Sequence, residues 1–577
     1  MARVRGWRWI YWVCLLCAAT AISSQAQITF TTLVTFNQTN GEEPDNLALI
    51  QGVDGNFYGT TYYGGDVCGF SGCGTIFKVT TSGTLTTLYQ FCAQTGCPDG
   101  SRPLGTLVLA TNGDFYGVTN ENGGISCSGG CGTIFKMTPE GTLSTLHTFC
   151  VLAKCPDGNA PAGGLVQATN GNFYGTTRFG NKLNNTGTVF EITPAGKLTT
   201  LYSFCSVRPQ CADGSQPQGT LIQASDGNVY GETEKGGTFN YGTIFKITPK
   251  GQLTTLYSFK ATDGDDPSGG LIQAADGNFY GVTAAGGSGY YCISNSGDGC
   301  GTVFEITPAG TLTTLHDFCT DTCTDGAFPY GPLVQATDGN LYGETFGYSS
   351  GPADVGTIFA ISTVGTLSTV FTFGPRGDGY GPTGGLLEAT NGTFYGTTSA
   401  GDGTVFSLST GLGPFVKVEP TSAKEGATIG IFGQGFSSSS IVRFGGVRAK
   451  DAKVSGTGLS FAGATFITAK VPAGALTGSV TVTTDGTTLT SNQPFLVTPQ
   501  LLSFSPPGGS VGTQVTITGS GFTQTSEVDF GGDVPAQFTV NSDKQVTATV
   551  PAGAQTGPIG VVTKGGTAVS SATFTVD

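Results

Sequence analysis

Residues 164–204 read GLVQATNGNFYGTTRFGNKLNNTGTVFEITPAGKLTTLYSF, and this phrase decides the fold because the chain repeats it seven times. A Tyr-Gly step recurs every 50 to 62 residues, and a Gly-Thr-(Ile/Val)-Phe block follows it in every copy. The tyrosines of the step are Tyr58, Tyr116, Tyr174, Tyr230, Tyr280, Tyr342 and Tyr395. A period this long is typical of a repeat architecture in which each repeat is one supersecondary unit.

Each copy predicts four short antiparallel strands. In the copy quoted they cover residues 165–168, 173–177, 188–193 and 198–204, and the tight turns Asn-Gly-Asn and Pro-Ala-Gly separate the first pair and the last pair. No stretch has sustained helical periodicity. Four antiparallel strands repeated radially indicate an all-β fold, a seven-bladed β-propeller over residues 27–412.

The fourth strand is missing from the last repeat. Six repeats carry a complete Leu-(Thr/Ser)-Thr-(Leu/Val) segment, whereas the seventh continues into Ser-Leu-Ser-Thr-Gly-Leu-Gly-Pro. A matching segment, FTTLVTF, occurs instead at residues 30–36. We therefore expect the N-terminal strand to complete the last blade and close the ring, which leaves no broad unpaired edge.

The N-terminus predicts export. Residues 1–26 combine three arginines, an apolar run and a small-residue cleavage site at Ser24-Gln25-Ala26, as in a secretory signal peptide. The apolar run is short for a membrane anchor, and a lipoprotein signal is disfavoured because Leu16 precedes Cys17. No second hydrophobic segment follows, so we expect no membrane span after signal removal and an extracellular or cell-surface location.

The charge balance excludes one class of partner. The full chain carries −14, and loss of the three signal arginines leaves about −17. Only 11% of residues are charged. An acidic chain of this kind does not favour nucleic acid or anionic membranes.

The fourteen cysteines outside the signal fall into seven pairs of close neighbours. None has the spacing with histidines that zinc sites need, so we predict seven local disulfides, each closing one loop of an exported protein. The pairs are Cys68-Cys73, Cys92-Cys97, Cys127-Cys131, Cys150-Cys155, Cys205-Cys211, Cys292-Cys300 and Cys319-Cys323. In an up-and-down meander these loops all emerge on one side, here called the loop face, and the tight turns occupy the opposite side, the turn face. Variable loops on a rigid scaffold commonly carry function, which makes the loop face the candidate working surface.

An aspartate, or in one repeat an asparagine, begins each loop between repeats, in the pattern (Asp/Asn)-Gly-x-x-Pro. These residues are Asn40, Asp99, Asp157, Asp213, Asp263, Asp325 and Asp378. They are candidates, with Asp265, for a ring of carboxylates near a central channel that binds a cation or sugar hydroxyls. The alternative is an Asx turn, in which the side chain caps its own loop. Calcium is one possible cation, although no loop matches a complete calcium-binding sequence.

Residues that break the repeat are better site candidates than residues that form it. After the Tyr-Gly step most copies have Thr or Val, whereas two have Glu232 and Glu344. Asp266, Arg102 and Arg376 are further local departures, and the loop tyrosines are either sugar-binding surfaces or ordinary loop packing. These include Tyr62, Tyr63, Tyr290, Tyr291, Tyr348 and Tyr380.

Catalytic chemistry has few candidates in this chain. The two histidines, His147 and His316, replace a fourth-strand tyrosine and are interpreted as outer-strand packing. A Ser-His-Asp triad or an HExxH zinc site is therefore excluded. An enzyme on this scaffold would use paired carboxylates, with Glu232 and Glu344 as weak candidates.

The composition changes after Pro414. Residues 415–497 and 498–577 are two copies of a second unit with alternating strands and no Cys or His, which predicts two small β-sandwiches. We interpret them as spacers rather than as ligand-binding modules. Three blocks recur in both copies: GQGF and GSGF, VRFGG and VDFGG, and VPAGA.

Both units resemble known families. The three blocks make the C-terminal pair similar to IPT/TIG domains, which implies an immunoglobulin-like fold. The repeats, through DGNFYGTT and GTIFKITP, resemble the GloVer tandem-repeat family of bacterial exported proteins. This resemblance implies compartment and architecture but supplies no chemistry. Members of the family carry varied C-terminal anchoring signals. None is evident at the Asp577 end, so both anchoring to the cell and release from it stay open.

Three function classes remain open. The first is a secreted or cell-surface binding or adhesion protein, expected to be a monomer, whose loop face binds extracellular carbohydrate or a surface protein. The second is a secreted polysaccharide-degrading enzyme, a carboxylate-based glycosidase or a lyase. The third is a structural envelope protein. No cofactor is expected beyond the calcium considered above.

Overall fold

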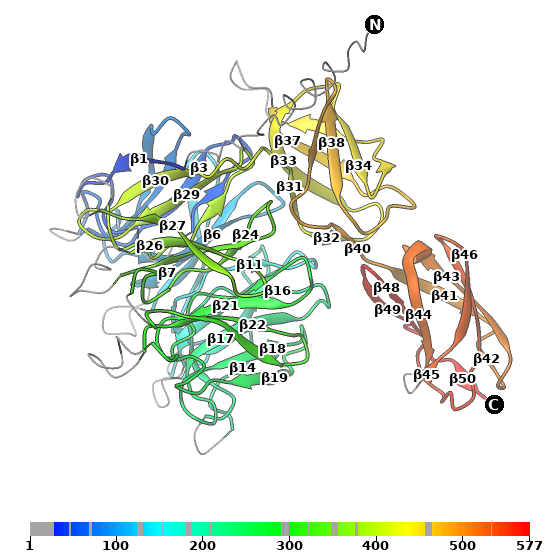
Figure 1. Ribbon diagram of the computed structural model, residues 1–577. Coiled ribbons are helices and arrows are strands. Elements are labelled where there is room, and N and C mark those ends of the chain that lie inside the picture. The colour runs from blue at the N-terminus through cyan, green and yellow to red at the C-terminus, as the bar shows by residue number, and fades with distance from the viewer. Residues whose placement is uncertain are drawn as a thin grey trace, which may run out of the picture.

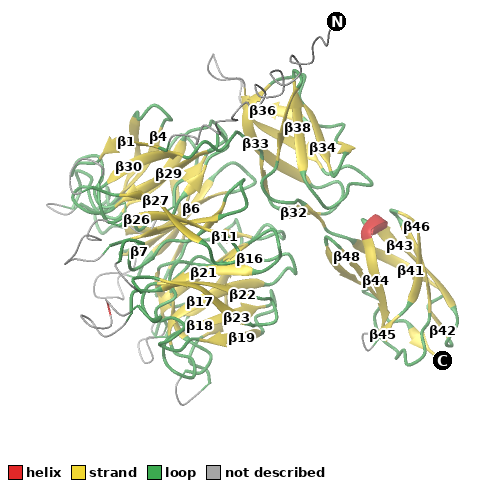
Figure 2. Ribbon diagram, viewed as in Figure 1, coloured by secondary structure: helices red, strands yellow, loops and turns green. Residues whose placement is uncertain are grey.

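The structure is a computed structural model of the 577-residue chain. It describes residues 28–44, 48–68, 72–123, 131–152, 154–180, 186–207, 211–289, 292, 299–320, 323–347, 356–374, 379–455, 464–531 and 534–577. The predicted signal at residues 1–26 lies outside this part of the chain. The described residues form an all-β protein in which antiparallel sheets dominate (Figures 1 and 2).

Residues 28–409 form seven sheets, numbered here by repeat, and each takes consecutive strands of one repeat. Sheets 1 to 3 contain β2 (Ile50–Gln51), β3 (Phe57–Thr61), β4 (Thr75–Val79), β5 (Leu85–Gln90); β6 (Ser101–Leu109), β7 (Phe115–Glu121), β8 (Thr133–Met137), β9 (Leu143–Thr148); and β10 (Asn159–Pro161), β11 (Val166–Gln167), β12 (Phe173–Phe179), β13 (Thr188–Ile192), β14 (Leu198–Ser203). Sheets 4 to 6 contain β15 (Ser215–Pro217), β16 (Ile222–Gln223), β17 (Val229–Lys235), β18 (Thr243–Ile247), β19 (Leu253–Ser258); β20 (Ile272–Gln273), β21 (Phe279–Thr283), β22 (Thr302–Ile306), β23 (Leu312–Asp317); and β24 (Val334–Gln335), β25 (Leu341–Thr345), β26 (Thr357–Ile361), β27 (Leu367–Thr372). Sheet 7 contains β28 (Leu387–Glu388), β29 (Thr393–Thr398), β30 (Thr404–Ser409) and the N-terminal β1 (Thr29–Thr35).

The N-terminal strand completes sheet 7. The order in this sheet is β1-β30-β29-β28, and β1 pairs antiparallel with β30 from Thr29 opposite Ser409 to Thr35 opposite Thr404. The first strand of the described chain therefore occupies the position that a fourth strand holds in the other six sheets.

A tyrosine packs each sheet against the next, and at five of the seven junctions its partner is also aromatic. The tyrosine of the Tyr-Gly step contacts the first residue of the second strand in the following sheet, as in Tyr58 against Phe115 (4.4 Å between ring centroids) and Tyr116 against Phe173 (4.1 Å). Tyr395 of sheet 7 contacts Phe57 of sheet 1 at 3.9 Å. Because the last sheet packs on the first, the seven sheets form a closed ring.

The repeated polar residues stabilise each sheet in the same way. In every sheet a threonine of the second strand shares a hydrogen bond of 2.8 to 2.9 Å with a threonine of the third, for example Thr61 with Thr75. In every sheet the hydroxyl of the Tyr-Gly tyrosine bonds the Asp or Asn of its own tight turn, at 2.7 to 3.2 Å. A buried hydroxyl with a partner avoids the cost of desolvation, so these contacts keep the strand ends in register.

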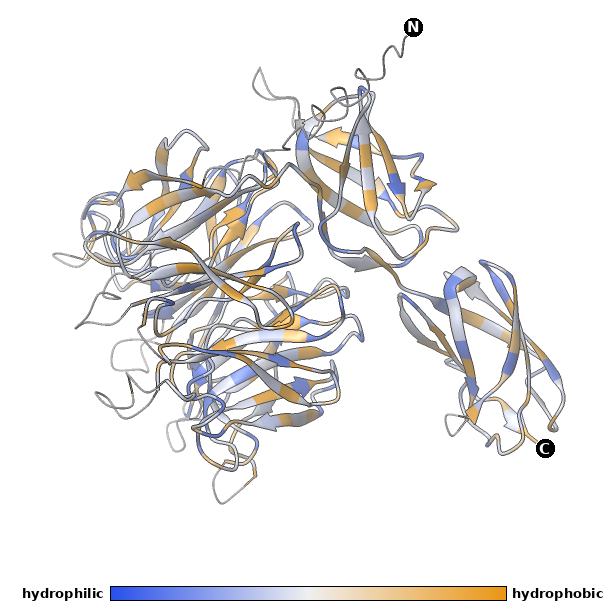
Figure 3. Ribbon diagram, viewed as in Figure 1, coloured by the Kyte–Doolittle hydropathy of each residue, from blue (hydrophilic) through white to orange (hydrophobic). Residues whose placement is uncertain are grey.

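Two modules of the same topology follow. The first contains β31 (Lys417–Glu419), β32 (Ser422–Ala423), β33 (Thr428–Phe436), β34 (Ile441–Phe444), β35 (Val447–Arg448), β36 (Lys453–Ser455), β37 (Ala464–Lys470), β38 (Val480–Thr484), β39 (Thr487–Thr490) and β40 (Leu496–Val497). The second contains β41 (Gln500–Ser505), β42 (Gly508–Gly509), β43 (Gln514–Ser520), η2 (Phe522–Gln524), β44 (Thr525–Phe530), β45 (Val534–Pro535), β46 (Gln537–Ser542), β47 (Gln545–Thr549), β48 (Gly560–Thr563), β49 (Gly566–Val569) and β50 (Thr575–Val576). The sheet orders β31-β33-β37-β36 and β35-β34-β38-β39 match β41-β43-β47-β46 and β45-β44-β48-β49. Apolar and polar residues alternate along these strands, so each module encloses its own core (Figure 3).

The first module rests on the turn face of the ring. Thr465 donates its hydroxyl to the carbonyl of Val53 (2.7 Å), and Gln434 Nε2 donates to Thr390 Oγ1 (2.8 Å). A third bond joins Gln493 to Gln335 at 2.8 Å. All three partners in the ring belong to tight turns or the strands beside them, and Figure 1 shows this module against that side. In the described chain, no helix is long and apolar enough to cross a membrane.

Candidate functional site

The structure contains six of the seven predicted cysteine pairs as disulfides. They are Cys68-Cys73, Cys92-Cys97, Cys150-Cys155, Cys205-Cys211, Cys292-Cys300 and Cys319-Cys323. Cys127 of the seventh pair lies outside the described residues. Within the described chain, the groups of three or more potential metal ligands consist of these cysteines alone, and neither aspartates nor glutamates form such a group.

Five aspartates of the predicted carboxylate ring each cap their own loop, whereas Asp265 pairs with Lys235. Asp99 accepts hydrogen bonds from the backbone N–H of Cys92 and the hydroxyl of Tyr89, both at 2.9 Å. Asp157, Asp213, Asp263 and Asp325 have the same arrangement, with a nearby backbone N–H and the fourth-strand Tyr or His as partners. The carboxylates thus cap their own loops, as the alternative predicts, but they bond N–H groups three to seven residues earlier in the chain, which differs from an Asx turn. The bonds to Tyr or His direct them toward the fourth strands. Asp378 lies outside the described residues.

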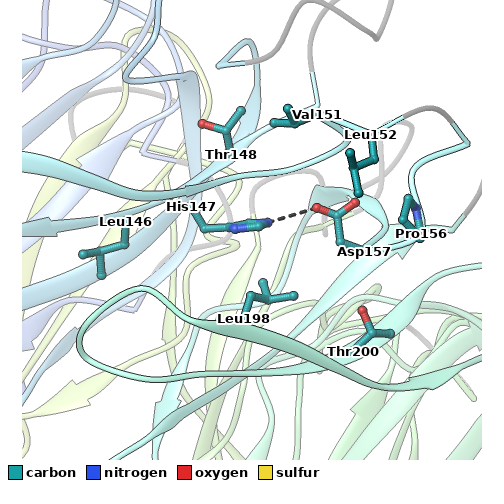
Figure 4. Close-up of a pocket in the computed structure, with 9 residues that line it drawn as sticks. All are labelled: Leu146, His147, Thr148, Val151, Leu152, Pro156, Asp157, Leu198 and Thr200. Carbon is teal, nitrogen blue, oxygen red and sulfur yellow. Dashed lines mark hydrogen bonds and ion pairs between the residues drawn. The ribbon is translucent and has the colours of Figure 1, made fainter.

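The two histidines take the place of tyrosines in this capping arrangement. His147 Nε2 lies 3.0 Å from Asp157 Oδ2, and His316 Nε2 lies 2.9 Å from Asp325 Oδ2. Figure 4 shows His147 and Asp157 in an open pocket of about 600 Å³ between β9 and β14, walled by the exposed Val151 and Leu152. The histidine ring stacks edge-on against Phe149, as expected for a packing role on the outer strand.

Glu232 and Glu344 lie at two separate interfaces between sheets. Each is 1% exposed, and each accepts one backbone N–H from the following sheet: Gly270 to Glu232 (2.9 Å) and Gly385 to Glu344 (3.0 Å). Burial raises the pKa of both carboxyl groups to about 8. The glutamates are thus largely protonated at neutral pH, and they do not share a partner.

The neighbouring sequence explains why glutamate stands at these two positions. At the equivalent place in other sheets, the N–H of Ala48 and that of Gly164 bond to a threonine hydroxyl of the next sheet, from Thr106 and Thr220. The sheets after Gly270 and Gly385 have Pro332 and Ala48 instead, which offer no hydroxyl. A long carboxyl side chain from the preceding sheet supplies the missing acceptor, because a buried N–H without a partner is costly.

Sequence reasoning missed a ring of residues with left-handed backbone. In every repeat the residue immediately before the proline of Asp-Gly-x-x-Pro has a φ between 52° and 67°, and six of the seven are not glycine. The seven residues are Glu43, Arg102, Ala160, Gln216, Asp266, Phe328 and Gly381. The sequence does distinguish this position, because its residue type differs in every repeat while the Gly and Pro of the pattern are the same in all seven.

These seven residues and the ends of the second strands form one surface, here called the mouth. The strand-end residues are Tyr62, Asn120, Arg178, Glu234, Ala284, Phe346 and Ser399. Backbone bonds join the two sets, as from Phe346 N–H to the Phe328 carbonyl (3.0 Å) and from Ala284 N–H to the Asp266 carbonyl (3.0 Å). The mouth lies on the loop face. About three residues further along the chain, glycine-rich segments pack backbone against backbone from sheet to sheet, as Gly219 packs against Gly270.

A left-handed conformation costs a residue with a side chain roughly 1–2 kcal/mol. Glycine removes that cost, and Gly381 shows that the loop accepts it. Six repeats nevertheless keep a side chain there, and the six differ in charge and size. Strain retained at a variable position is the pattern expected of residues that contact a ligand.

One sector of the mouth is charged. Arg178 and Glu234 form an ion pair of 2.6 Å, and Lys235 lies 3.4 Å from Asp265. Burial, with smaller contributions from the neighbouring Glu234 and Asp265, raises the pKa of Asp266 to about 6, against the opposing effect of the two cations. Asp265 and Asp266 thus have different roles, since only Asp265 has an ion-pair partner within the described chain.

Two further sectors contain aromatic rings. Arg102 pairs with Glu121 at 2.5 Å and lies over the rings of Tyr62 and Tyr63, at 5.6 and 5.1 Å from their centroids. In sheet 6, Phe346 is 39% exposed and meets the Tyr330 ring edge-on at 6.2 Å. Arg376, Tyr290, Tyr291 and Tyr348 lie outside the described residues.

The repeats identify the family. The model of the Gloeobacter/Verrucomicrobia repeat matches residues 20–167, 124–322 and 206–408, which together cover more than half of the chain. The chain belongs to this family. The IPT/TIG domain model matches residues 499–576, so the second C-terminal module is immunoglobulin-like. None of the curated proteins searched matches the sequence.

Several solved structures show distant similarity. A fungal alcohol oxidase of the AA5 family in complex with copper is 12% identical over 95% of this chain and 98% of its own, with a TM-score of 0.43. The extracellular domain of a hybrid two-component system from B. thetaiotaomicron is 11% identical over 82% of this chain and 59% of its own, with a TM-score of 0.42. A surface glycan-binding protein from a xyloglucan utilization locus in Bacteroides uniformis is 22% identical over 28% of this chain and 48% of its own, with a TM-score of 0.14. At these values the similarities bear on neither ligand nor chemistry.

Proposed function

We propose that this Gloeobacter/Verrucomicrobia repeat protein is a secreted or cell-surface binding protein whose mouth binds extracellular carbohydrate. In this proposal residues 27–412 are a seven-bladed β-propeller closed by its N-terminal strand. Residues 415–497 and 498–577 are two IPT/TIG modules that act as spacers. The six disulfides of the described chain fit an extracytoplasmic location.

The proposal rests on one observation at the mouth. Six repeats have different side chains at a position whose left-handed backbone costs energy, although the seventh repeat has glycine there. The two faces of the ring support it. The first C-terminal module covers part of the turn face, and the hydrogen bonds that join it to the ring in the described chain lie on that face rather than at the mouth. A protein carried on spacers can thus present its loop face outward.

Carbohydrate suits the mouth because aromatic rings and polar groups lie side by side there. Exposed aromatic rings pack against the apolar faces of sugars, and charged groups bond their hydroxyls. Phe346 provides such a ring, and the Arg178–Glu234 pair provides charged groups.

The test is binding of residues 27–577 to a panel of soluble and insoluble polysaccharides, with calcium or with a chelator. Retention and release of reducing ends are both scored. We expect retention without release, and a loss of retention in Phe346→Ala. The matched control is Phe239→Ala, which removes a ring of similar exposure (50%) on the loop between β17 and β18, outside the mouth.

Three results would contradict the proposal. Release of reducing ends would indicate an enzyme, and its loss in Glu232→Gln or Glu344→Gln would identify the acids. Equal retention by both phenylalanine variants would place binding away from the mouth. Absence of retention on every polysaccharide would favour a protein ligand or a structural role.

A further inference from the structure

Three buried polar atoms in the charged sector have no hydrogen-bond partner within the described chain. They are Nε of Arg178, Oδ1 of Asp266 and Oγ of Ser268. Buried polar atoms are nearly always paired, so an unpaired atom calls for an explanation. Here the three belong to neighbouring residues of one sector, since Asp266 interacts electrostatically with Arg178 and Ser268 is two residues further along the same loop.

The three atoms offer complementary chemistry. The Arg178 Nε carries an N–H and can only donate, the Asp266 carboxylate accepts, and the Ser268 hydroxyl can do either. The sector also opens to solvent, because the Arg178 side chain is 36% exposed. A ligand group that both donates and accepts satisfies all three atoms, and hydroxyl groups on adjacent carbons do so with one ligand.

The charges select against anions. Each cation of the sector already has an acidic partner: Arg178 has Glu234, and Lys235 has Asp265. Asp266 then leaves one excess negative charge when it is ionised. A sulfate, phosphate or uronate would meet this carboxylate without a free cation, and like charges in a partly buried site repel.

The next position round the mouth supplies an apolar surface. Phe328 follows Asp266 in the ring of left-handed residues, and Phe346 and Tyr330 lie beside it. A sugar ring presents hydroxyls at its edge and C–H groups on its face, so it can meet both sectors at once.

We propose that the sector formed by Arg178, Glu234, Asp266 and Ser268 binds adjacent hydroxyl groups of a neutral sugar residue, with the sugar's apolar face toward Phe328 and Phe346. This inference rests on the proposed function and narrows it to one sector of the mouth and one ligand class. Arg102, although also in the mouth, lies outside the sugar site.

The test compares two ion pairs of equal chemistry in the full chain. One variant is Arg178→Gln with Glu234→Gln, and its control is Arg102→Gln with Glu121→Gln, whose arginine is similarly exposed (32%). A second comparison sets Asp266→Asn against Asp265→Asn. The probes are hexasaccharides of glucose, mannose and xylose, with heparin and polygalacturonate as anionic probes, and affinity is measured by calorimetry at pH 7.5.

At least one neutral hexasaccharide should bind the parent chain, and its affinity should fall about tenfold or more in the 178/234 double variant and in Asp266→Asn. Both controls should stay within about threefold. In the parent chain the affinity should also fall as the pH drops below about 6, because protonation of Asp266 removes its charge and weakens it as an acceptor, and Asp266→Asn should abolish this dependence. Glu234, Lys235, Asp265, Arg178 and Glu232 are the titratable or charged groups around Asp266.

The other outcomes distinguish failure of the sugar site from failure of the proposed function. If neutral sugars bind and only Phe346→Ala or the 102/121 variant reduces affinity, the inference is wrong and the proposed function stands. Preference for an anionic probe also overturns it. If no probe binds, the proposed function fails together with it. Thermal unfolding of each variant checks folding, and Ser268→Ala, a smaller change, replaces any variant that does not fold and is expected to weaken binding at least threefold.

Discussion

The two faces of the ring differ in how much their side chains vary from repeat to repeat. On the turn face all seven tyrosine hydroxyls bond the side chain at the same turn position, donating to Asp in four repeats and accepting from Asn in three. At the mouth the backbone is equally uniform, with φ between 52° and 67°, but the side chains are all different. Repetition of a side chain therefore marks the scaffold in this protein, and we propose that variation on a repeated backbone marks the binding site.

The largest expected effect tests whether the loop glycines belong to the scaffold. Gly214 follows the capping Asp213 and has a φ of 99°, and an added Cβ would lie 2.6 Å from the hydroxyls of both Thr233 and Thr243. We expect Gly214→Ala to lower the free energy of unfolding by about 3 kcal/mol or more, through strain and loss of the threonine pair. Chemical denaturation measures this.

Gly227 of the same repeat is the matched control. Its φ is 81°, but no atom lies within 4 Å of an added Cβ. Gly227→Ala should therefore cost about 1 kcal/mol, from backbone conformation alone. Equal costs for the two variants would show that the contact with the threonine pair adds nothing to stability.

The next effect concerns the buried acids that replace Thr or Val. The pKa of Glu344 is raised by burial to about 8, so the native state holds a proton that the unfolded state releases near pH 4.5. Stability should thus fall as the pH rises from about 4.5 to about 8. Glu344→Gln keeps an acceptor for the Gly385 N–H and removes the titration.

We therefore expect Glu344→Gln to raise the melting temperature by at least about 3 °C at pH 8.5 and to change it little at pH 4. Thermal unfolding across this pH range measures the difference. Glu232→Gln should behave alike, since Glu232 has the same burial and the same kind of bond. A melting temperature that is lower at both pH values would mean that the carboxylate itself stabilises the ring.

A smaller effect comes from one acid in a row of amides on the turn face. Five repeats have a glutamine whose Oε1 accepts a backbone N–H from the preceding sheet: Gln51, Gln167, Gln223, Gln273 and Gln335. All of these except Gln51 also donate from Nε2 to a glycine carbonyl of their own turn. Sheet 7 has Glu388, whose Oε1 accepts from Thr337 while Oε2 is buried and unpaired in the described chain. Burial raises its pKa to about 7.

Glu388→Gln should add about 1–2 kcal/mol of stability at pH 8.5, because an amide can donate where an ionised carboxylate cannot. The gain should shrink toward pH 5, where Glu388 is protonated. The reverse change, Gln273→Glu, should destabilise at pH 8.5 and less at pH 5. If neither variant depends on pH, the glutamine row does not act through hydrogen bonding.

The sequence predicted the scaffold well because the scaffold is what repeats. The strands, the pairing of β1 with β30 and the cysteine neighbours follow from patterns visible in the residues, and the family model confirms the resemblance of the repeats. Arg102 and Asp266 were noticed as departures, but Arg178, Glu234 and Phe346 were not. They occupy ordinary strand ends, and only the three-dimensional ring places them beside the left-handed residues.

The role of Glu232 was also out of reach of the sequence. A glutamate after Tyr-Gly suggests a catalytic acid, because it departs from the repeat. Its function in the fold depends on a proline 100 residues later, Pro332, which lacks the hydroxyl that a threonine offers elsewhere. Sequence reasoning compares equivalent positions, whereas this bond joins different positions of neighbouring sheets.

The smallest effect on stability bears most directly on the mouth. Gln216 has a φ of 56°, so Gln216→Gly should relieve roughly 1 kcal/mol of strain and offset the added freedom of the unfolded chain. Stability should be unchanged or up to about 1 kcal/mol higher. Gln252→Gly, beside β19 and without left-handed backbone, should cost about 1 kcal/mol.

Denaturation midpoints of both variants measure this difference, and the same samples serve for carbohydrate binding. A ring that keeps its side chains for a ligand should lose affinity in Gln216→Gly while gaining or keeping stability. If Gln216→Gly destabilises the chain as much as Gln252→Gly does, the left-handed residues are unstrained. Their variety would then reflect tolerance rather than selection for binding, because a position without cost needs no ligand to explain it.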